Sequence, residues 1–368
     1  MSAEPIPLAR PVLGEAEEAR VLEVLRSGRL SLGPAVPAFE EAFAAHLGAR
    51  FASAVSSGTA GLHLALRAAG VREGDEVVTS PFSFVASANS ILYERARPVF
   101  VDIDPVTLNV DPDAAASAVT DRTAALLPVH IFGYPADVPS LERLDLPIVE
   151  DACQALGARH PDGVLVGARG HPAVFGFYAN KQLTTGEGGM VTTGDAEFKA
   201  RVDSERNQGR APDMGWLDHD RLGFNYRLSD VACAIGLGQL ERLDDLLAAR
   251  ARVAGAYRGA LGGVEGLDLP CLDQDGNHRS WFVFVVQLPR GADRDGVVRA
   301  LREQGIDSKP YLPAIHLMTF YREQLGHGEG EFPVCEDVAA RSLALPFFPG
   351  LTEGQVGRVA EALRGALS

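Results

Sequence analysis

The stretch EVVTSPFSFVASANSILYERARPVFVDI, residues 76–103, contains two short β-rich runs on either side of a helical segment. The runs EVVTS (76–80) and RPVFVDI (97–103) are apolar and β-branched, whereas apolar residues between them recur at intervals of three and four. A strand, a helix and a strand in this order are typical of a parallel sheet, because the helix carries the chain back before the next strand begins.

The same alternation extends from about Arg50 to Gly194. Further predicted elements are the strands RFASAV (50–55), AALLPV (124–129), LPIVED (146–151) and AVFGFY (173–178), and the helix GTAGLHLALRAAG (58–70). We therefore predict an α/β fold with a largely parallel sheet covered by helices on both faces. Ligands of such sheets bind at the carboxyl ends of strands, so the chemistry is expected there.

After Asp195 the pattern becomes helical, and it ends in a second α/β region. The predicted elements are a helix at 198–209, two helices within 228–261, a strand at 281–288, and helices at 295–305 and 352–367. We predict a large domain, residues 1–250, and a smaller C-terminal domain, residues 251–368. The N-terminal helix at residues 15–28 is expected to pack on the smaller domain.

The composition is that of a globular chain with an acidic surface. It has 368 residues, enough for two domains, of which 46% are hydrophobic. The 34 basic and 49 acidic residues give a net charge of −15, which would repel nucleic acid and anionic lipid. The start lacks a signal-peptide pattern, and no run approaches the roughly 18 apolar residues of a membrane span. We expect a cytoplasmic protein with no nucleic-acid or membrane partner.

The four cysteines are scattered along the chain. They are Cys153, Cys233, Cys271 and Cys335. With no C-x-x-C pair and no histidine at ligand spacing, neither a disulfide framework nor a zinc site is indicated. We expect four buried thiols and no bound metal.

Lysine is rare in this chain, and the only lysines are Lys181, Lys199 and Lys309. Lys181 lies in FGFYANKQLTTGEGGMV (175–191), between a β-rich run and a glycine-rich turn that leads into another such run. A desolvated amine at a strand end, near a cationic group, has a lowered pKa and can attack a carbonyl carbon, as Schiff-base lysines do. A solvated loop lysine is the alternative, so other features must converge on Lys181.

Three features would complete a site around Lys181. Asp151 ends an apolar strand and could pair with a protonated pyridine nitrogen, although a helix N-cap is the alternative. Residues 56–59 form a turn at a helix N-terminus, where free N–H groups favour a phosphate, although ordinary caps look the same. Phe82 and Phe84 could offer a flat face to a ring, although core packing is the default. Pyridoxal phosphate has the aldehyde, pyridine nitrogen, phosphate and ring that match all four features.

Eight segments of the chain resemble one enzyme family. In order they are GTAGLHLAL, GDEVVTSPFSFVASANSI, PVFVDIDPVTLNVD, PVHIFGYPAD, VEDACQALGA, FYANKQLTTGEGG, FNYRLSDVACAIGLGQLERLD and YLPAIHLMTFY. Over nearly its whole length the chain closely resembles the DegT/DnrJ/StrS sugar aminotransferases. The resemblance implies the fold type I architecture of pyridoxal phosphate enzymes and a homodimer with composite active sites. It also implies transfer of an amino group, usually from L-glutamate, to a keto group of a nucleotide-linked sugar.

The resemblance also implies roles for individual residues. Lys181 would form the Schiff base with the cofactor and then act as general acid and base, and Asp151 would keep the pyridinium nitrogen protonated. The other cofactor contacts would be Gly58 and Thr59 at the phosphate, Phe84 on the ring, Gln154 near the phenolic oxygen, and Asn225 reaching the phosphate from the neighbouring subunit. Arg227, Tyr311 and His316 would be substrate contacts, with a structural loop histidine as the alternative for His316. Phe82 would then be a core residue.

One position departs from the family pattern. Five residues before the lysine the family usually has a serine whose hydroxyl binds the phosphate, and here that residue is Gly176. One lost hydrogen bond removes roughly 0.5–3 kcal/mol. We expect weaker cofactor retention, or a water in place of the hydroxyl, with the same chemistry. A related branch has histidine at the lysine position and performs 3-deoxygenation of the sugar, and Lys181 argues against that branch.

We therefore predict a pyridoxal phosphate-dependent aminotransferase acting on a nucleotide-linked keto-6-deoxyhexose, with C4 favoured over C3. One alternative is an enzyme for a keto-cyclitol or an aminated aromatic precursor on the same fold. Another is a cofactor-binding regulator without turnover. Nucleotide hydrolysis and NAD binding are not indicated, because no G-x-x-x-x-G-K-[ST] and no strand-linked G-x-G-x-x-G occurs.

Overall fold

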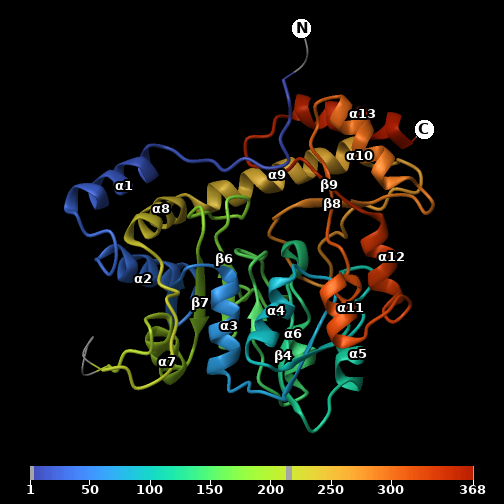
Figure 1. Ribbon diagram of the computed structural model, residues 1–368. Helices are drawn as coiled ribbons and strands as arrows, with labels where there is room; N and C mark the ends of the chain where they lie inside the picture. Colours follow the sequence, from blue (N-terminus) through green and yellow to red (C-terminus); the bar gives the residue numbers. More distant parts are fainter. Residues whose placement is uncertain (1–3, 213–217, 368) are drawn as a thin grey trace.

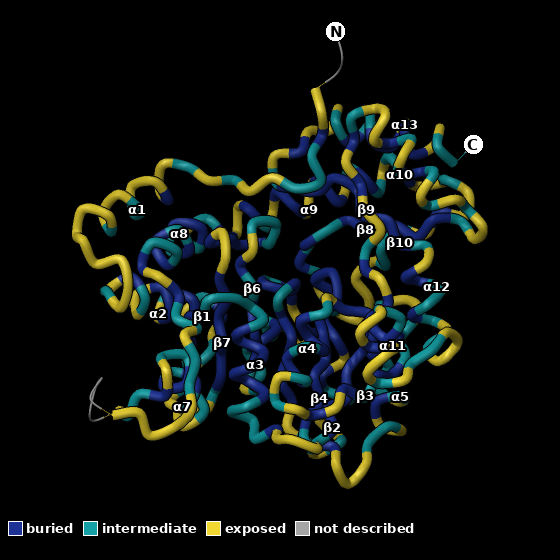
Figure 2. The backbone as a smooth tube through the Cα atoms, in the orientation of Figure 1, coloured by how far each residue is buried: buried dark blue, intermediate teal, exposed yellow. Residues whose placement is uncertain are grey.

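A computed structural model describes residues 4–212 and 218–367. Figure 1 shows the central strands running through the molecule with helices on both sides, and the C-terminal elements lying across one end. Figure 2 shows that these strands are among the most deeply buried segments. This is the α/β architecture that the alternation of strands and helices predicts.

Within the described residues, two sets of strands lie side by side and form one main sheet. The first set is β3 (Arg97–Phe100), β2 (Glu76–Thr79) and β4 (Thr123–Leu127), all parallel. The second is β5 (Glu150–Asp151), β6 (Ala173–Gly176), β7 (Gly189–Thr193) and β1 (Phe51–Val55). Parallel bridges from Leu126 to Ile148 and from Val129 to Asp151 join β4 to β5. Among these strands β7 runs against its neighbours, so the sheet is largely parallel, as predicted.

Both faces of the sheet are packed, because alternate residues of a strand point to opposite sides. Ala173 and Phe175 lie in one core and Val174, between them, lies in another. The first face is covered by α2 (Ala35–Leu47), α8 (Asp230–Glu241), α5 (Pro112–Ser117) and α6 (Val138–Glu142). The second is covered by α3 (Gly58–Ala68), α4 (Ala86–Tyr93) and α7 (Ala196–Arg206).

The C-terminal part has its own sheet and core. Its strands β8 (Phe284–Gln287), β10 (Ser342–Leu345) and β9 (Lys309–Pro310) are antiparallel. Its core contains residues of α9 (Leu243–Leu261), α10 (Arg294–Glu303) and α13 (Glu353–Leu367). Two further hydrophobic clusters contain residues of both parts and so join the C-terminal part to the main sheet. They include residues of η1 (Ile131–Gly133), η2 (Ile315–Leu317), α11 (Thr319–Leu325) and α12 (Pro333–Arg341).

Helix α9 crosses the domain boundary predicted at residue 250. Its first residue, Leu243, packs in the core under α2, whereas Tyr257 packs in the C-terminal core. The helix therefore connects the two parts rigidly, and the division into residues 1–250 and 251–368 stays a prediction.

The prediction that the N-terminal helix packs on the C-terminal domain is wrong. Helix α1 (Glu15–Ser27) lies against α8, because Gly238 has no side chain and a Cβ there would be 2.9 Å from Glu17 Cγ. The buried Glu17 carboxylate accepts a hydrogen bond from Gln239 Nε2 at 2.6 Å and pairs with Arg242. It is Ile6, before the helix, that enters the C-terminal core.

The thiols are less uniformly buried than predicted. All four are free, but only Cys233 and Cys335 are buried, while Cys153 and Cys271 are half-buried. The Cys271 sulfur accepts a hydrogen bond from Arg279 Nη2 at 3.0 Å. Across the described ranges, none of the helices combines the length and apolar character needed to cross a bilayer.

Candidate active site

Lys181 lies in the connection between β6 and β7. Its N–H donates to the Tyr178 carbonyl at 3.0 Å, and Tyr178 forms a bridge with Gly186 as the chain turns back. Where β7 begins, a Cβ on Gly189 would lie 2.8 Å from the Ser57 carbonyl oxygen, so only glycine permits this approach. The lysine turn therefore lies next to the turn that starts α3.

The Lys181 amine occupies a half-buried position, with Nζ 4.0 Å from the centre of the Phe282 ring. Burial lowers the pKa of Lys181, because removal from water disfavours the ammonium form. Cys153 and Asp151 oppose this shift, and the charge of Arg250 adds to it. More of this amine is unprotonated near neutral pH than for an ordinary lysine, as attack on a carbonyl requires.

Asp151 ends β5 and is 5% exposed. Its Oδ2 accepts a hydrogen bond from Ser87 Oγ at 2.6 Å, and its Oδ1 accepts one from the Cys153 N–H at 3.1 Å. The residues after it form turns and not a helix, so the N-cap alternative is not supported. The two donors orient the carboxylate and leave acceptor capacity on both oxygens for a further donor such as a pyridinium N–H.

Helix α3 begins at the predicted phosphate turn. Ser57 is its N-cap, with Oγ accepting from the Ala60 N–H at 3.0 Å. The N–H groups of Gly58 and Thr59 lie in the first turn, where a helix offers no acceptor of its own and its dipole is positive. Both residues are half-buried, so these donors are open to an anion.

Cys153 shows that these segments meet. A Cβ on Gly58 would lie 2.8 Å from Cys153 Sγ and 3.4 Å from Gly176 Cα. A Cβ on Gly176 would lie 3.4 Å from Cys153 Sγ. Burial raises the pKa of the Cys153 thiol, Asp151 raises it further and Lys181 opposes both. The phosphate turn, Gly176 and Asp151 therefore contact Cys153, and Lys181 lies close enough for its charge to affect the thiol.

The two phenylalanines of SPFSF have different environments. Phe82 has no exposed surface and packs edge-on against Phe132 at 5.7 Å, whereas Phe84 is 59% exposed. The Phe84 carbonyl accepts from the Ser87 N–H at 3.1 Å, and Ser87 also bonds Asp151. Phe84 is thus the one of the two whose ring is free to offer a face, on a backbone that contacts Ser87, and Phe82 is a core residue.

Gln154 and Tyr311 both contact Phe132, the first through a hydrogen bond to its backbone and the second through its ring. Gln154 is 3% exposed, and its Oε1 accepts from the Phe132 N–H at 3.0 Å. Within residues 4–212 and 218–367 its Nε2 makes no hydrogen bond, so this group is available to a ring oxygen. The Tyr311 ring lies 5.8 Å from the Phe132 ring, and burial raises the pKa of Tyr311 to about 12. Tyr311 is therefore a neutral hydrogen-bond donor at physiological pH.

Asn225 and Arg227 lie on a segment beside the end of β1. The Ser56 N–H donates to the Tyr226 carbonyl at 2.8 Å, and Arg227 forms a bridge with Val55. Arg227 is half-buried and donates through Nη1 to Asn207 Oδ1 at 3.1 Å. Asn225 is exposed and adjoins Tyr226, whose carbonyl binds Ser56 at the start of the phosphate turn of the same chain. Its reach into a neighbouring subunit stays a prediction.

His316 is completely buried. Its Nε2 lies 3.1 Å from Glu336 Oε1, and its ring packs edge-on against Phe332 at 4.7 Å. Burial lowers the pKa of His316, and the contact with Glu336 opposes this. With no exposed surface, His316 fits the structural loop histidine that the sequence left open better than a substrate contact.

The other two lysines have ordinary surroundings. Lys199 forms an ion pair with Asp203 one turn along α7, and Lys309 is exposed on β9. Neither lies at the carboxyl end of a strand of the main sheet. Only Lys181 has the environment that the proposed chemistry needs.

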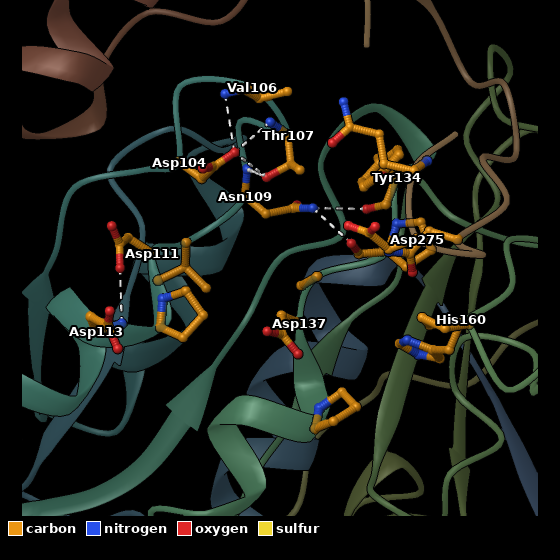
Figure 3. A pocket seen from close by; sticks show the side chains of 18 residues that line it. Asp104, Val106, Thr107, Asn109, Asp111, Asp113, Tyr134, Asp137, His160 and Asp275 are labelled. Atoms are coloured by element: carbon orange, nitrogen blue, oxygen red, sulfur yellow. Dashed lines mark hydrogen bonds between the residues drawn. The ribbon is translucent and has the colours of Figure 1, made fainter. Parts of the chain in front are cut away.

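A cavity of about 550 Å³ lies between the loop after β3, the segment around η1 and residues 274–277 (Figure 3). Two of its carboxylates accept hydrogen bonds from nearby backbone N–H groups: Asp104 Oδ1 accepts from the Thr107 N–H at 2.6 Å, and Asp137 caps α6. The Asn109 amide donates to the Tyr134 carbonyl at 3.2 Å across it. None of the predicted site residues is among the described residues that line this cavity, so its polar groups mainly hold loops together.

Three residues at the site were not predicted: Ser87, Phe282 and Arg250. Ser87 contacts Asp151 from 64 positions away, and Arg250 contacts the Lys181 backbone from 69 positions away. No local pattern marks such residues, because their partners are defined only by the folded chain.

The groups of this site fit pyridoxal phosphate. The first turn of α3 offers N–H donors in a cradle that a Cβ on Gly58 would fill, which suits a phosphate. The exposed Phe84 ring suits an aromatic ring, the Asp151 carboxylate suits a pyridinium nitrogen, and the Lys181 amine suits an aldehyde. Fold and site together define the class as a pyridoxal phosphate-dependent aminotransferase.

Comparison with known proteins places the chain within this class. Residues 11–364 match the model of the DegT/DnrJ/EryC1/StrS aminotransferase family, and the chain belongs to that family. GDP-perosamine synthase of Caulobacter vibrioides is 39% identical over 366 residues, covering 97% of each chain. Spore coat polysaccharide biosynthesis protein SpsC of Bacillus subtilis is 38% identical over 376 residues, covering 98% of this chain and 96% of SpsC.

A solved structure supports the same assignment. The crystal structure of DesV from S. venezuelae in complex with a ketimine intermediate has a TM-score of 0.92 and 35% identity, covering 99% of this chain and 98% of DesV. The predicted fold class, the pyridoxal phosphate cofactor and the aminotransferase activity in sugar biosynthesis are confirmed.

Proposed function

We propose that this aminotransferase transfers an amino group from L-glutamate to C4 of a nucleotide-linked 4-keto-6-deoxyhexose. The observation that carries the proposal is the meeting of Lys181, Asp151 and the first turn of α3 around Cys153. A nucleotide-linked acceptor is supported by the relative whose name gives a GDP-linked product.

Each residue of this group has a distinct task in the proposal. The cofactor, when bound, supplies an electron sink for the bonding electrons at the substrate carbon. Asp151 would accept the pyridinium N–H in the orientation that Ser87 sets, and the N–H groups of Gly58 and Thr59 would donate to the phosphate. The Lys181 amine would hold the cofactor and, once released from it, would act as the base and acid that moves a proton of the substrate, a task that its lowered pKa favours near neutral pH.

Arg227 and Tyr311 are the proposed substrate contacts. The Arg227 guanidinium is half-buried, its Nε has no partner among the described residues, and its planar fork suits a carboxylate or a nucleotide phosphate. The protonated Tyr311 hydroxyl suits a sugar oxygen. His316 is not included in the proposal, because it is buried against Glu336.

We also propose a homodimer with active sites shared between subunits. Phe84 and Tyr178 are 59% and 53% exposed, and both flank the Lys181 and Asp151 segments. Large exposed aromatic side chains are enriched at protein interfaces. The exposed Asn225 would then contact the phosphate bound by the other chain.

The two half-reactions test the proposal separately. Addition of L-glutamate to the cofactor-loaded enzyme should convert the visible absorbance of the aldehyde form to that of the pyridoxamine form. A nucleotide-linked 4-keto-6-deoxyhexose should then restore the original spectrum, and the product should carry nitrogen at C4. Restoration by a 3-keto sugar, a keto-cyclitol or an aromatic precursor alone would assign one of those acceptors instead. No conversion with any amino acid would indicate a regulator without turnover.

A further inference from the structure

Arg250 is a buried arginine whose hydrogen-bond partners are backbone carbonyls. It lies on α9 and is 3% exposed. Nη1 donates to the Phe282 carbonyl at 3.1 Å, and Nη2 donates to the carbonyls of Asn180 at 3.2 Å and Lys181 at 2.8 Å. Burial lowers the pKa of Arg250 to about 10, so the side chain is protonated at neutral pH. A buried charge usually has a counter-ion, and here three carbonyl dipoles take that place.

The three carbonyls all belong to Lys181 or to the wall beside it. The carbonyls of Asn180 and Lys181 belong to the two peptide groups that flank the Lys181 Cα, and Nη2 binds both. The third carbonyl belongs to Phe282, whose ring centre is 4.0 Å from Lys181 Nζ. One guanidinium therefore binds the backbone of the lysine and the backbone of the residue whose ring lies against its amine.

The residue after the lysine is held by a separate contact. Gln182 Nε2 donates to the Gln154 carbonyl at 2.6 Å and reaches the Ser280 carbonyl at 3.4 Å. This contact ties the far side of the lysine turn to the segment before Phe282. Of the two peptide groups around the Lys181 Cα, the first is also held by the Lys181 N–H, which donates to the Tyr178 carbonyl at 3.0 Å, and Arg250 binds the carbonyl of each.

We propose that Arg250 is a positioning residue that holds the Lys181 turn and the Phe282 backbone together and so places the Lys181 amine for reaction with the cofactor. The inference rests on the proposed role of Lys181 as the cofactor lysine. Two properties of Arg250 contribute and can be separated. Its positive charge disfavours a second charge on Lys181, whose pKa Arg250 lowers. Its planar fork binds three acceptors at once, which a lysine ammonium cannot do in the same geometry.

Two substitutions separate charge from geometry. R250Q removes the charge and keeps N–H donors, whereas R250K keeps the charge and loses the fork. For R250Q we expect the pH midpoint of the visible absorbance of lysine-bound cofactor to rise by about one unit, since a nearby like charge is lost. For R250K we expect the midpoint to stay close to the wild-type value and the rate of cofactor uptake by the apoenzyme to fall about tenfold, since hydrogen bonds to the lysine turn are lost.

Arg252→Met is the matched control, because Arg252 lies on the same helix and is exposed. It should leave both the midpoint and the uptake rate unchanged. Borohydride reduction and peptide mass spectrometry of the wild type identify the lysine that carries the cofactor. If that lysine is not Lys181, the role proposed for Lys181 and this inference are both overturned.

Other outcomes overturn only the inference. Cofactor on Lys181 of the wild type, with a wild-type midpoint in R250Q and wild-type uptake in R250K, would mean that Arg250 does not position the amine. A lower unfolding temperature without any change in midpoint or uptake rate would show a purely structural role. If R250Q does not fold, the uptake rate of R250K alone tests the proposal: a rate about tenfold below wild type supports it, and a wild-type rate rejects it.

Discussion

Gly176 faces Cys153 at the point where the phosphate turn begins. A Cβ at this position would lie 3.4 Å from both Cβ and Sγ of Cys153, which is an ordinary van der Waals contact. The departure from the usual serine is therefore not imposed by lack of space. A hydroxyl introduced here would lie beside the first turn of α3, whose N–H groups are the proposed phosphate donors.

Gly176→Ser is therefore expected to tighten cofactor binding. A regained hydrogen bond to a phosphate contributes roughly 0.5–3 kcal/mol, so the dissociation constant of pyridoxal phosphate should fall by a factor between about 2 and 150. Equilibrium dialysis of the apoenzyme measures it. Gly176→Ala is the control, since it adds the Cβ without the hydroxyl and should give no gain. Equal affinities for the serine and alanine variants would refute a phosphate contact at this position.

His160 is a buried residue whose titration affects stability. It is 1% exposed, and neither ring nitrogen has a hydrogen-bond partner among the described residues. Burial, and secondarily the neighbouring His130, lower the pKa of His160 from 6.5 to about 4. Between these values the unfolded chain binds a proton that the folded chain does not, so the free energy of unfolding falls as the pH decreases through this window.

We expect this single histidine to contribute up to about 3 kcal/mol to the loss of stability between pH 6.5 and 4. In His160→Phe that share of the pH dependence should disappear, while stability above pH 6.5 changes with packing alone. Urea unfolding at fixed protein and cofactor concentration over this range measures the slope. His278→Gln, at an exposed histidine, should keep the wild-type slope. A wild-type slope in His160→Phe would show that another group titrates.

At the scale of elements, the strand ends of the site could be predicted because their signals are local. Asp151 and Lys181 each follow an apolar run, and residues 56–59 precede a helix with clear periodicity. The contacts that orient them could not be predicted, since Ser87 and Arg250 reach them across 64 and 69 positions. Contacts of this kind depend on how the helices stack.

The misplacement of α1 and the direction of β7 have similar causes. Helix α1 is polar, and its position depends on one buried carboxylate, Glu17, and on the absence of a side chain at Gly238. Strand β7 was recognised as a β-rich run, but only its pairing shows that it runs against β1 and β6. Periodicity identifies an element, whereas packing and pairing define its place.

The approach of α3 to the end of β5 gives a prediction at this scale. A Cβ on Gly58 would lie 2.8 Å from Cys153 Sγ, so Gly58→Ala must push α3 or Cys153 aside. We expect a loss of about 1–3 kcal/mol in stability and weaker cofactor binding. Adding Cys153→Ala removes the sulfur and leaves Gly176 Cα, at 3.4 Å, as the nearest atom, so the double variant should recover most of both losses. Thermal unfolding and cofactor titration measure this recovery.

Cys153→Ala alone is the control for this pair, because the thiol has no proposed chemical role. It should bind cofactor nearly as well as the wild type. A double variant no better than Gly58→Ala would place the clash elsewhere.

At the scale of the whole molecule, the site is assembled from distant parts of one chain. The segment of Asn225 lies beside β1, the lysine turn follows β6, and Arg250 comes from the helix that leads into the C-terminal part (Figure 1). Asn225 is exposed and adjoins Tyr226, which binds Ser56 of the phosphate turn in the same chain, yet the family resemblance assigns Asn225 to the neighbouring subunit. The two arrangements differ in which chain must supply it.

Subunit mixing distinguishes these arrangements. Lys181→Ala should abolish turnover, and Asn225→Ala should lose most activity at limiting cofactor. When the two variants are unfolded, mixed in equal amounts and refolded, half of the dimers contain one chain of each kind. If Asn225 serves the other subunit, each mixed dimer has one intact site, and the mixture should recover about a quarter of wild-type activity. If Asn225 serves its own chain, every site carries one substitution and the mixture stays as inactive as its parents. Light scattering shows whether dimers form, and a monomer with full activity would reject the shared site altogether.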